Sequence, residues 1–357
     1  MSKWRNEKNQ IPKVIYLTFL NPEYSRSSVN FQKSNSIFQF ELIQVRNSLR
    51  RSLWDLIAVS WKNRKLAHVY VVMSPCHILV IILRILTRKK IVLDAGWSMT
   101  EATLARNRNK IQKYKSFLID FLSFHFANLV ILESNAQIKF SAKIFKVRKD
   151  KLIRLFTGFN EKLIPQSKLK MTDSSNYFNE KNVRLKIIFR GSYNSESGIE
   201  LIIEAAKKLV DVCSFIIVSR NFPKNMIISS NVTIIDRYLT WAELEAQYNT
   251  SILAIGQVSN HPRLQNTIPH KAFEAAYFGK AYLTCDTPSI REIFPSAEDV
   301  FYYDGGGVES LISTILEILI DSRLIEIRSK NIRICYEGFF SQEIIRNQML
   351  SILQKNV

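Results

Sequence analysis

Three polar side chains in the second half of the chain are spaced to share one flank of a helix start. Pro269 suits the first position of a helix, and Glu274 follows His270 and Lys271 by four and three residues. A helix N-terminus offers free N–H groups and the positive end of a dipole, which suit a diphosphate. Lys271 would add a cation, and Glu274 would accept hydrogen bonds from sugar or ribose hydroxyls. An ordinary helix start, with Glu274 as a capping residue and Lys271 as a solvated charge, fits equally well.

A second candidate is the turn Arg190-Gly191-Ser192, which follows an apolar run typical of a strand. Gly191 permits close approach of the backbone to a ligand, Arg190 offers a planar fork for phosphate, and Ser192 adds a hydroxyl donor. We expect this turn and the helix start at Pro269 to lie side by side and to form a pocket of positive potential for a pyrophosphate. Taken alone, the turn is explained as well by an ordinary connection between a strand and a helix.

The first half offers candidates for handling a second substrate. Asp94 ends an apolar run typical of a strand, and ligands bind at the carboxyl ends of strands in parallel sheets, so its carboxylate could position an acceptor hydroxyl. His77 opens an expected helix and could do the same. Tyr24 and Arg26 are available in the loop after the first strand. Asp94 and His77 also fit a structural role as a capping or buried group.

Short apolar runs alternate with amphipathic segments along the whole chain, which predicts an α/β fold with parallel sheets. No internal repeat and no low-complexity tract interrupts this rhythm. The expected strands cover residues 14–18, 69–73, 91–94, 129–132, 185–189, 215–218, 232–235, 252–255 and 281–284. The expected helices cover residues 38–58, 77–86, 110–126, 197–210, 241–248, 269–278, 307–320 and 341–354.

Charge and composition divide the chain into two domains. Residues 1–164 carry 29 Lys and Arg against 10 Asp and Glu, whereas residues 165–357 carry 21 against 21, so the whole excess of +19 lies in the first part. Residues 165–183 are polar and without periodicity, which predicts a linker. We therefore expect a basic N-terminal domain, a C-terminal domain at 184–340, and a helix at 341–357 that packs back on the first domain.

Two segments of the second half resemble the retaining family-4 (group 1) glycosyltransferases. The run from Glu274-Ala275 to Gly279-Lys280 matches the second half of the donor signature of that family, in which two Glu residues bracket a helix start with seven residues between them. Asn266 stands where the first Glu is expected. The segment IIFRGSYNSESGIELIIEAAKKL is similar to the family's strand, glycine loop and helix, with Ser192 and Ser197 at positions that are usually basic. The resemblance is weaker before residue 185 and poor in residues 1–127.

This resemblance implies the GT-B fold, with two Rossmann-like domains whose parallel sheets face each other across a cleft. It implies a metal-independent glycosyltransferase of hexosyltransferase type that uses a nucleotide-sugar as substrate, acts on a lipid-linked or polysaccharide acceptor with retention, and needs no cofactor. Glu274 and Asp94 are the expected catalytic residues, and Tyr24, Arg26 and His77 are expected on the acceptor side. The donor would be bound by Arg190, Gly191, Ser192, Arg263, Asn266, Thr267, Lys271 and Glu274.

The basic first half implies an anionic partner, and an anionic membrane surface is the expected one. Residues 78–90 and 110–126 each combine an apolar face with Lys and Arg, as interfacial helices do, although most of their apolar residues should pack on the sheet. The apolar segment 66–87 is broken at Ser74-Pro75 and fits two elements better than one membrane span. The polar start and four scattered cysteines predict a cytoplasmic protein, bound peripherally at the inner face of the cell membrane.

Other functions stay open at this stage. The basic half could bind nucleic acid, although no helix-turn-helix, zinc finger or RNP signature is visible in the sequence. Asn266 in place of Glu could mark a glycosyltransferase-like protein that has lost catalysis. Two-domain folds of this kind also host sugar-nucleotide epimerases.

Overall fold

The computed structural model describes residues 11–20, 25–31, 34–46, 48–163 and 185–356. The chain forms two compact units, the first made of Met1–Gly158 with Gln342–Val357 and the second of Phe159–Ser341. Tyr24 and the predicted linker at 165–183 lie outside the described residues.

The first unit is built on a six-stranded parallel sheet in the order β2-β1-β3-β4-β5-β6. Strands β1, β3, β4 and β5 read as nearly continuous apolar runs, because helices cover both faces of the sheet. The strands are β1 Lys13–Thr18, β2 Gln39–Gln44, β3 Ala67–Met73, β4 Lys90–Gly96, β5 Leu129–Leu132 and β6 Leu152–Arg154. The helices are α1 Ser25–Asn30, α2 Leu49–Asn63, α3 His77–Leu86, α4 Met99–Ala105, α5 Lys110–Phe126, α6 Asn135–Phe145 and α13 Gln342–Asn356.

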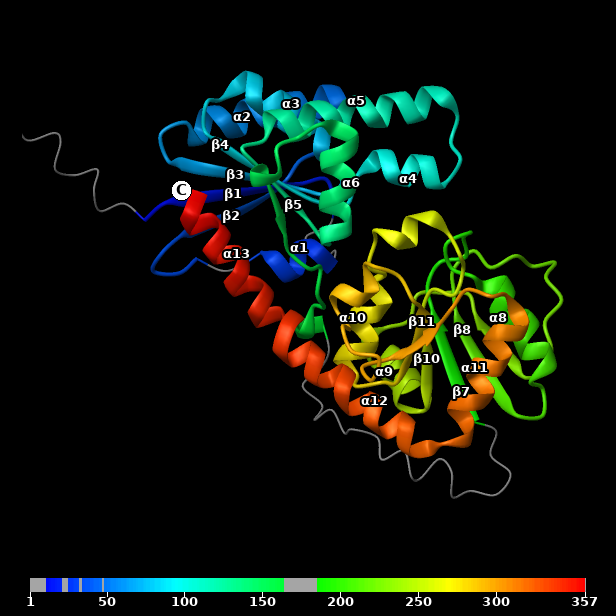
Figure 1. Ribbon diagram of the computed structural model, residues 1–357. Helices are drawn as coiled ribbons and strands as arrows, with labels where there is room; N and C mark the ends of the chain where they lie inside the picture. The colour runs from blue at the N-terminus through cyan, green and yellow to red at the C-terminus, as the bar shows by residue number, and fades with distance from the viewer. Residues whose placement is uncertain (1–10, 21–24, 32–33, 47, 164–184, 357) are drawn as a thin grey trace, which may run out of the picture. The chain divides into compact units, whose positions relative to one another are not determined.

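Helices α2, α3 and α5 form a layer on one face of this sheet, and α1 and α13 lie on the other (Figure 1). Helix α13 comes from the far end of the sequence and caps α1. Arg346 donates from Nε to the carbonyl of Val29 at 2.9 Å and from Nη2 to the carbonyl of Ser28 at 3.1 Å. The last carbonyls of a helix have no partner within it, so these bonds satisfy the end of α1.

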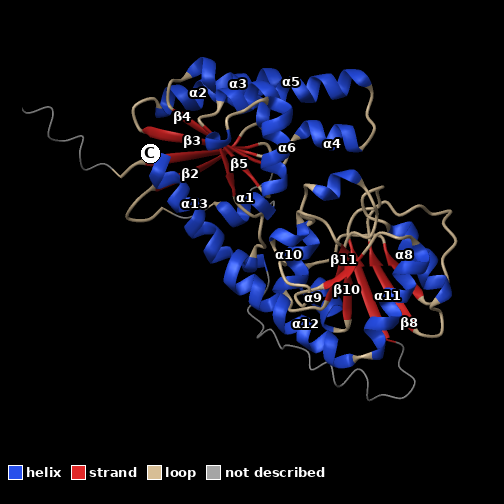
Figure 2. Ribbon diagram, in the orientation of Figure 1, coloured by secondary structure: helices blue, strands red, loops and turns tan. Residues whose placement is uncertain are grey.

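The second unit repeats the architecture with the strand order β12-β11-β10-β7-β8-β9, again all parallel. Helices α8 and α11 lie on one face, and α10 and α12 lie on the other (Figure 2). The strands are β7 Leu185–Arg190, β8 Cys213–Val218, β9 Val232–Ile235, β10 Leu253–Ile255, β11 Tyr282–Cys285 and β12 Phe301–Tyr303. The helices are α8 Ile199–Lys208, α9 Trp241–Asn249, α10 His270–Tyr277, α11 Val308–Ile320 and α12 Ser322–Cys335, with a 3₁₀ turn at Pro262–Gln265 and a π-helical turn at Tyr336–Phe340.

The order of strands in the second sheet creates a switch point beside its first strand. From β7 the chain adds β8 and β9 on one side, then crosses back and adds β10, β11 and β12 on the other. The connections that leave the adjacent strands β7 and β10 therefore run toward opposite sides of the sheet. In open parallel sheets ligands bind at such a point, beyond the carboxyl ends of the strands.

One predicted element is wrong. The expected helix at 38–58 is strand β2 followed by helix α2. Phe38 and Phe40 are buried and alternate with exposed Gln39, which is the period of a strand. The apolar residues that follow hid this alternation. The elements absent from the prediction are mostly short, namely α1, α4, α6, α12, β6 and β12.

A fully buried acidic side chain ties two helices of the first unit together. Asp120 of α5 accepts hydrogen bonds at Oδ2 from the backbone N–H and the hydroxyl of Thr100 at the start of α4, at 2.7 and 2.8 Å. Its Oδ1 lies 3.3 Å from Nδ1 of His77, which is also fully buried. Burial raises the pKa of Asp120 to about 7, against the opposing effect of the hydrogen bonds from Thr100, and burial lowers the pKa of His77 to about 4.

We expect Asp120→Asn to remove a loss of stability that the unaltered protein suffers as the pH rises. The carboxyl has a higher pKa in the folded state than in the unfolded state, so its contribution is present at low pH and is lost between pH ~4 and ~7. The free energy of unfolding, measured by urea titration across this range, should therefore rise for the variant relative to the unaltered protein. Unfolded His77 titrates alike in both proteins, and the pKa of about 4 of folded His77 lies at the lower limit of this range.

Asp55→Asn is the matched control. The hydrogen bond from Arg46 holds the pKa of Asp55 below its ordinary value, so its contribution changes only in more acidic solution. A stability difference between Asp120→Asn and the unaltered protein that stays constant between pH ~4 and ~7 would contradict the assignment.

Candidate functional site

The carboxyl edge of the second sheet brings the two predicted segments together. Strand β7 ends at Arg190, and the next residue, Gly191, faces the first turn of α10. A Cβ atom added at Gly191 would lie 2.7 Å from Nζ of Lys271, so only glycine leaves room for the amine. Helix α10 begins at His270, one residue later than predicted, with Pro269 as its N-cap. The expected juxtaposition of turn and helix start is present, and its role in binding stays a prediction.

The side chain of Lys271 is buried beneath this turn, between an amide and an aromatic side chain. Its Nζ donates a hydrogen bond to Oε1 of Gln257, just past β10, at 3.2 Å and lies 3.7 Å from the ring centroid of Phe189. Burial and then the charge of Arg190 lower the pKa of Lys271 well below its ordinary value, against the opposing charges of two glutamates. The amine is therefore short of negative partners, and an anion placed at this edge would raise its pKa.

Glu274 anchors the second cation of the site. Its carboxylate is fully buried, and Oε1 lies 3.0 Å from Nη1 of Arg190 and 3.0 Å from Nδ1 of His270. The hydroxyl of Tyr248 lies 3.5 Å from Oε2. Burial alone would raise the pKa of Glu274, but the charges of Arg190, His270 and Lys271 and the hydrogen bond from His270 outweigh it and lower the pKa.

The predicted contact of Glu274 with a sugar or ribose hydroxyl is not available in this arrangement. Its carboxylate has no exposed surface, so a ligand hydroxyl could reach it only if Arg190 or His270 moved aside. The ionised carboxylate instead fixes Arg190, whose side chain is about one-third exposed, at 34%. The arrangement makes Glu274 a positioning residue for the cations.

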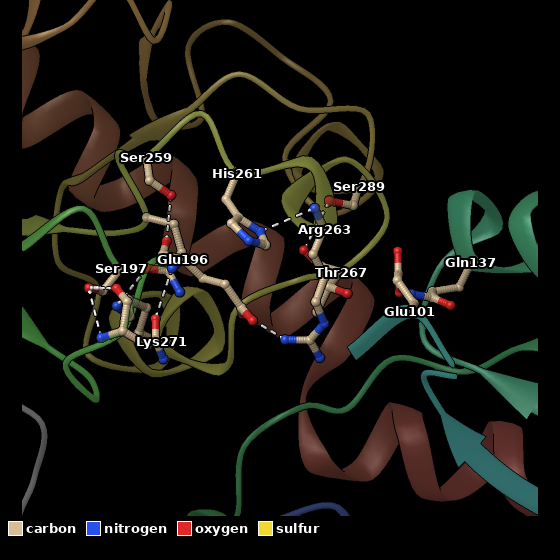
Figure 3. A network of polar contacts seen from close by, with 12 residues as sticks. Glu101, Gln137, Glu196, Ser197, Ser259, His261, Arg263, Thr267, Lys271 and Ser289 are labelled. Atoms are coloured by element: carbon tan, nitrogen blue, oxygen red, sulfur yellow. Dashed lines mark hydrogen bonds and ion pairs between the residues drawn. The ribbon is translucent and has the colours of Figure 1, made fainter. Parts of the chain in front are cut away.

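A buried ion pair joins the loops that follow β7 and β10. Nη1 of Arg263 lies 2.6 Å from Oε2 of Glu196, and the hydroxyl of Ser259 donates to the carbonyl of Glu196 at 2.7 Å (Figure 3). Gly198 has a φ of +71°, and a Cβ atom there would lie 2.7 Å from the backbone nitrogen of Ser259. These contacts hold the two loops in one arrangement. Arg263, which was predicted to contact a donor, instead forms the ion pair with Glu196 in this structure.

The remaining predicted donor residues surround this core. Ser192 is exposed in the turn after β7, and Asn266 is half-buried between the 3₁₀ turn and α10. Thr267 is buried, and its carbonyl accepts a hydrogen bond from the hydroxyl of Ser289 at 3.1 Å.

Sequence reasoning missed four residues of this edge: Phe189, Glu196, Tyr248 and Gln257. Gln257 follows a glycine just after the expected strand at 252–255, so its place at the carboxyl end of a strand was a usable signal. Phe189 and Tyr248 read as ordinary core residues, and Glu196 reads as one polar residue among several in a loop. Their parts depend on contacts between segments that are far apart in the sequence.

The first unit has a separate polar cluster at the carboxyl edge of its own sheet. Asp94, at the end of β4, accepts at Oδ1 from Nε and Nη2 of Arg26, at 2.8 and 2.6 Å, and at Oδ2 from Nδ2 of Asn30, at 2.8 Å. Nη1 of Arg26 donates to the hydroxyl of Thr157 at 2.9 Å. Asp94 is fully buried and Arg26 nearly so, which means that both side chains hold α1 against the sheet.

Asp94 and His77 take the buried role that the sequence allowed as the alternative to an acceptor contact. The carboxylate of Asp94 has both oxygens occupied and no exposed surface, so in this arrangement it cannot position an acceptor hydroxyl. His77 lies under α5, with its ring centroid 6.3 Å from that of Phe124, and it too has no exposed surface. We therefore assign neither of them a contact with an acceptor.

Sequence comparison finds no relative, whereas structure comparison finds many. No protein-family model and no curated protein matches the sequence. HepE (Alr3699) from Anabaena, in complex with UDP, matches with a TM-score of 0.71 over 96% of this chain and 100% of that chain, at 12% identity. A glycosyltransferase from Rickettsia africae matches with 0.65 over 96% and 98%, at 12% identity. The UDP-GlcNAc 2-epimerase of Neisseria meningitidis, bound to UDP-GlcNAc, matches with 0.56 over 96% and 99%, at 13% identity.

At these sequence identities the likeness establishes the fold alone. The predicted class is confirmed as an α/β protein with two Rossmann-like units, each on a six-stranded parallel sheet, of the GT-B type. Chemically, two cations, a glycine turn and a helix N-terminus lie at the switch point of the second sheet, and this combination suits an anion.

We expect the binding of pyrophosphate to be accompanied by uptake of a proton at Lys271. Pyrophosphate would give the buried amine a negatively charged partner, so the pKa of Lys271 should be higher in the complex than in the free protein. Protons are then taken up between these two pKa values, and the affinity should fall as the pH rises through this window. Calorimetry in two buffers of different ionisation enthalpy measures the number of protons exchanged.

The comparison with Lys271→Met isolates this residue, because the ionisation of pyrophosphate itself is common to both titrations. Lys280→Met is the matched control. Lys280 is another buried lysine, whose pKa burial lowers to about 8, but its amine donates to the carbonyl of Ser251. Equal proton uptake by the unaltered protein and by Lys271→Met would refute the prediction.

Proposed function

We propose that the chain is a glycosyltransferase that moves a hexosyl unit from a nucleoside-diphosphate donor to a lipid-linked or polysaccharide acceptor. In this proposal the second unit holds the donor and the first unit handles the acceptor. The observation that carries it is Lys271, held against Gly191 at the switch point of the second sheet, with Arg190 fixed beside it by Glu274. A diphosphate is the ligand that this set of groups would hold best.

Two further observations support a nucleotide-sugar as the donor. The fold is shared with HepE, which has been solved with UDP and with UDP-glucose. The resemblance of the segment 274–280 to the donor signature of family-4 glycosyltransferases comes from the sequence alone and points to the same helix start. Together they favour a nucleoside diphosphate over a simple phosphate.

The reaction breaks the bond between the anomeric carbon of the sugar and the β-phosphate oxygen, and a bond forms from the acceptor oxygen to that carbon. Negative charge develops on the departing diphosphate, where Arg190, Lys271 and the N-terminus of α10 would stabilise it. Charge stabilisation by groups already in place is a large contribution to catalysis. The acceptor proton passes to the departing phosphate oxygen, which needs no separate base and fits retention of configuration. We propose that these cations serve without a metal ion.

Asn266 replaces the Glu that the family uses to contact the transferred sugar. Its amide can still donate and accept hydrogen bonds, and it is half-buried next to the start of α10. We therefore propose an active enzyme whose choice of sugar differs from that of relatives with Glu. A donor that binds but is never turned over with any acceptor would instead indicate a protein that has lost catalysis.

We propose a cytoplasmic location at the inner face of the membrane, with a lipid-linked acceptor and anionic lipids as partners of the basic first half. Nucleic-acid binding is not favoured, because two of the fold relatives described above, HepE and the epimerase, were solved with UDP or a UDP-sugar. An epimerase remains the competing enzyme, since the same fold hosts one. Incubation of sugar nucleotides without an acceptor distinguishes the two, because only an epimerase would change the configuration at one carbon of the sugar.

We expect Lys271→Ala and Arg190→Ala each to lower donor hydrolysis or transfer by about 100- to 1,000-fold, the range for removing one group that stabilises developing charge. Lys208→Ala and Arg237→Ala are the controls, since both are exposed residues of the second unit that pair with exposed carboxylates. Activity is measured with donors identified in a thermal-shift screen of sugar nucleotides, where a specific ligand raises stability by mass action. Full activity of both site variants would defeat the proposal.

We expect Gly191→Ala to weaken UDP binding by about tenfold or more while changing stability little. The new methyl group would displace the flexible end of Lys271, and a charge-assisted hydrogen bond is worth ~1.5–3 kcal/mol. Gly338→Ala is the matched control, because a Cβ atom there meets nothing within 4 Å. Calorimetry measures affinity and urea titration measures stability. Unchanged affinity in a folded Gly191→Ala protein would show that the turn and the amine do not act together.

A further inference from the structure

Helix α2 carries an exposed apolar stripe that the fold of the first unit does not use. Leu53, Trp54, Ile57 and Trp61 recur at helical spacing and all lie at the surface, with Trp54 62% and Trp61 70% exposed. We call these four residues the α2 stripe. Large aromatic side chains usually contribute to cores or interfaces, so two exposed tryptophans two turns apart indicate a contact surface.

The other two helices of this layer also expose apolar residues. Helix α2 packs against α3, and α3 packs against α5, so the three helices form one layer (Figure 1). On this layer α3 adds Ile85, which is 80% exposed, and α5 adds Ile111 and Tyr114, also strongly exposed. Four other apolar residues of α3, Leu79, Val80, Ile82 and Leu83, are core, as was expected for most of the apolar residues of this segment. The exposed aromatic surface therefore centres on α2, which the sequence pattern had not indicated.

The surface around the stripe is strongly basic. Residues 49–126 contain 14 Lys and Arg against 4 Asp and Glu. Of the four acidic residues, Asp94, Glu101 and Asp120 are buried, and Asp55 is paired with Arg46. Negative charge is thus almost absent from the outer surface of the layer. The exposed basic residues of the layer include Arg51, Lys62, Arg64, Lys65, Arg88, Lys110 and Lys115.

We infer that the α2 stripe docks on an anionic lipid bilayer, with the tryptophans at the boundary of headgroups and acyl chains and the basic residues on the phosphates. This inference rests on the proposed function and specifies its membrane contact. Tryptophan beside Lys and Arg is the composition of interfacial helices. The guanidinium of Arg64 lies 4.2 Å from the ring centroid of Trp61, so cation and ring are already joined.

Lipid fits this surface better than nucleic acid. Phosphates of a nucleic acid would use the basic residues, and exposed rings could stack on bases. Leu53, Ile57, Ile85 and Ile111 add nothing to such a contact, whereas they bury apolar surface in a bilayer. In the part of the chain that the structure describes, no helix has the length and the apolar character needed to cross a membrane, so the stripe would bind at the surface.

The test measures binding of the full chain to vesicles of phosphatidylcholine with phosphatidylglycerol, by flotation. The double variant Trp54→Ser with Trp61→Ser should lose at least about tenfold in partition coefficient, given the apolar area that two rings would bury. The matched control is Ile227→Ser with Ile320→Ser, two strongly exposed apolar residues of the second unit, and it should bind as the unaltered protein does. Binding should also weaken on vesicles of phosphatidylcholine alone.

The inference is overturned if the tryptophan variant keeps full vesicle binding, or if the unaltered protein binds duplex or single-stranded nucleic acid and not vesicles. Urea titration confirms that the variant is folded, which is expected because both rings are exposed. The thermal shift with sugar nucleotides is measured on the same proteins and should not change in the variant. Vesicle binding without binding of any sugar nucleotide would defeat the transferase proposal but would still support the docking surface. Binding of a sugar nucleotide without vesicle binding would defeat only the docking surface.

Discussion

The arrangement of the candidate site depends on one buried charge, the carboxylate of Glu274. Because it has no exposed surface, its charge is compensated within the protein, by Arg190 and His270 at 3.0 Å each. Arg190 is thereby fixed beside Gly191, and Lys271 of the same helix turn is left with an amide oxygen and an aromatic ring as its neighbours. The second unit thus holds the guanidinium of Arg190 and the amine of Lys271 in place before any ligand arrives, and a ligand need not order these side chains at its own cost.

This arrangement exists because the sheet brings distant segments to one edge. Gly191 follows the first strand of the second unit, Gln257 follows the fourth, and Lys271 belongs to the helix after that. The ion pair between Glu196 and Arg263 then keeps the connecting loops from moving independently. Rigid support of this kind is what positions a binding constellation within fractions of an ångström.

The sequence predicted the fold class and most long elements, because the apolar runs of buried parallel strands and the helical spacing of residues such as those in α8 and α11 are local signals. It also predicted that Gly191 and Lys271 would meet. It left a buried structural role open for Asp94 and His77 without deciding it, and it did not predict that Glu274 would be sealed from solvent, since burial depends on neighbours that are far away in the chain. Strand β2 was predicted as a helix because its alternation of buried and exposed residues covers only a few positions and is followed directly by the apolar residues of α2. The exposure of Trp54 and Trp61 was equally invisible, because an apolar stripe looks the same whether it faces the core or the solvent.

The contact between α13 and α1 links the two ends of the described chain and sets an order of events. Residues 342–356 are synthesised after the whole of the second unit, yet they supply the groups that close the end of α1. During synthesis, the C-terminal end of α1 therefore stays uncapped until residues 342–356 have been made. The second unit, continuous from residue 159 to residue 341, can complete its own sheet before then. The first unit is thus the first to be synthesised and the last to complete its fold.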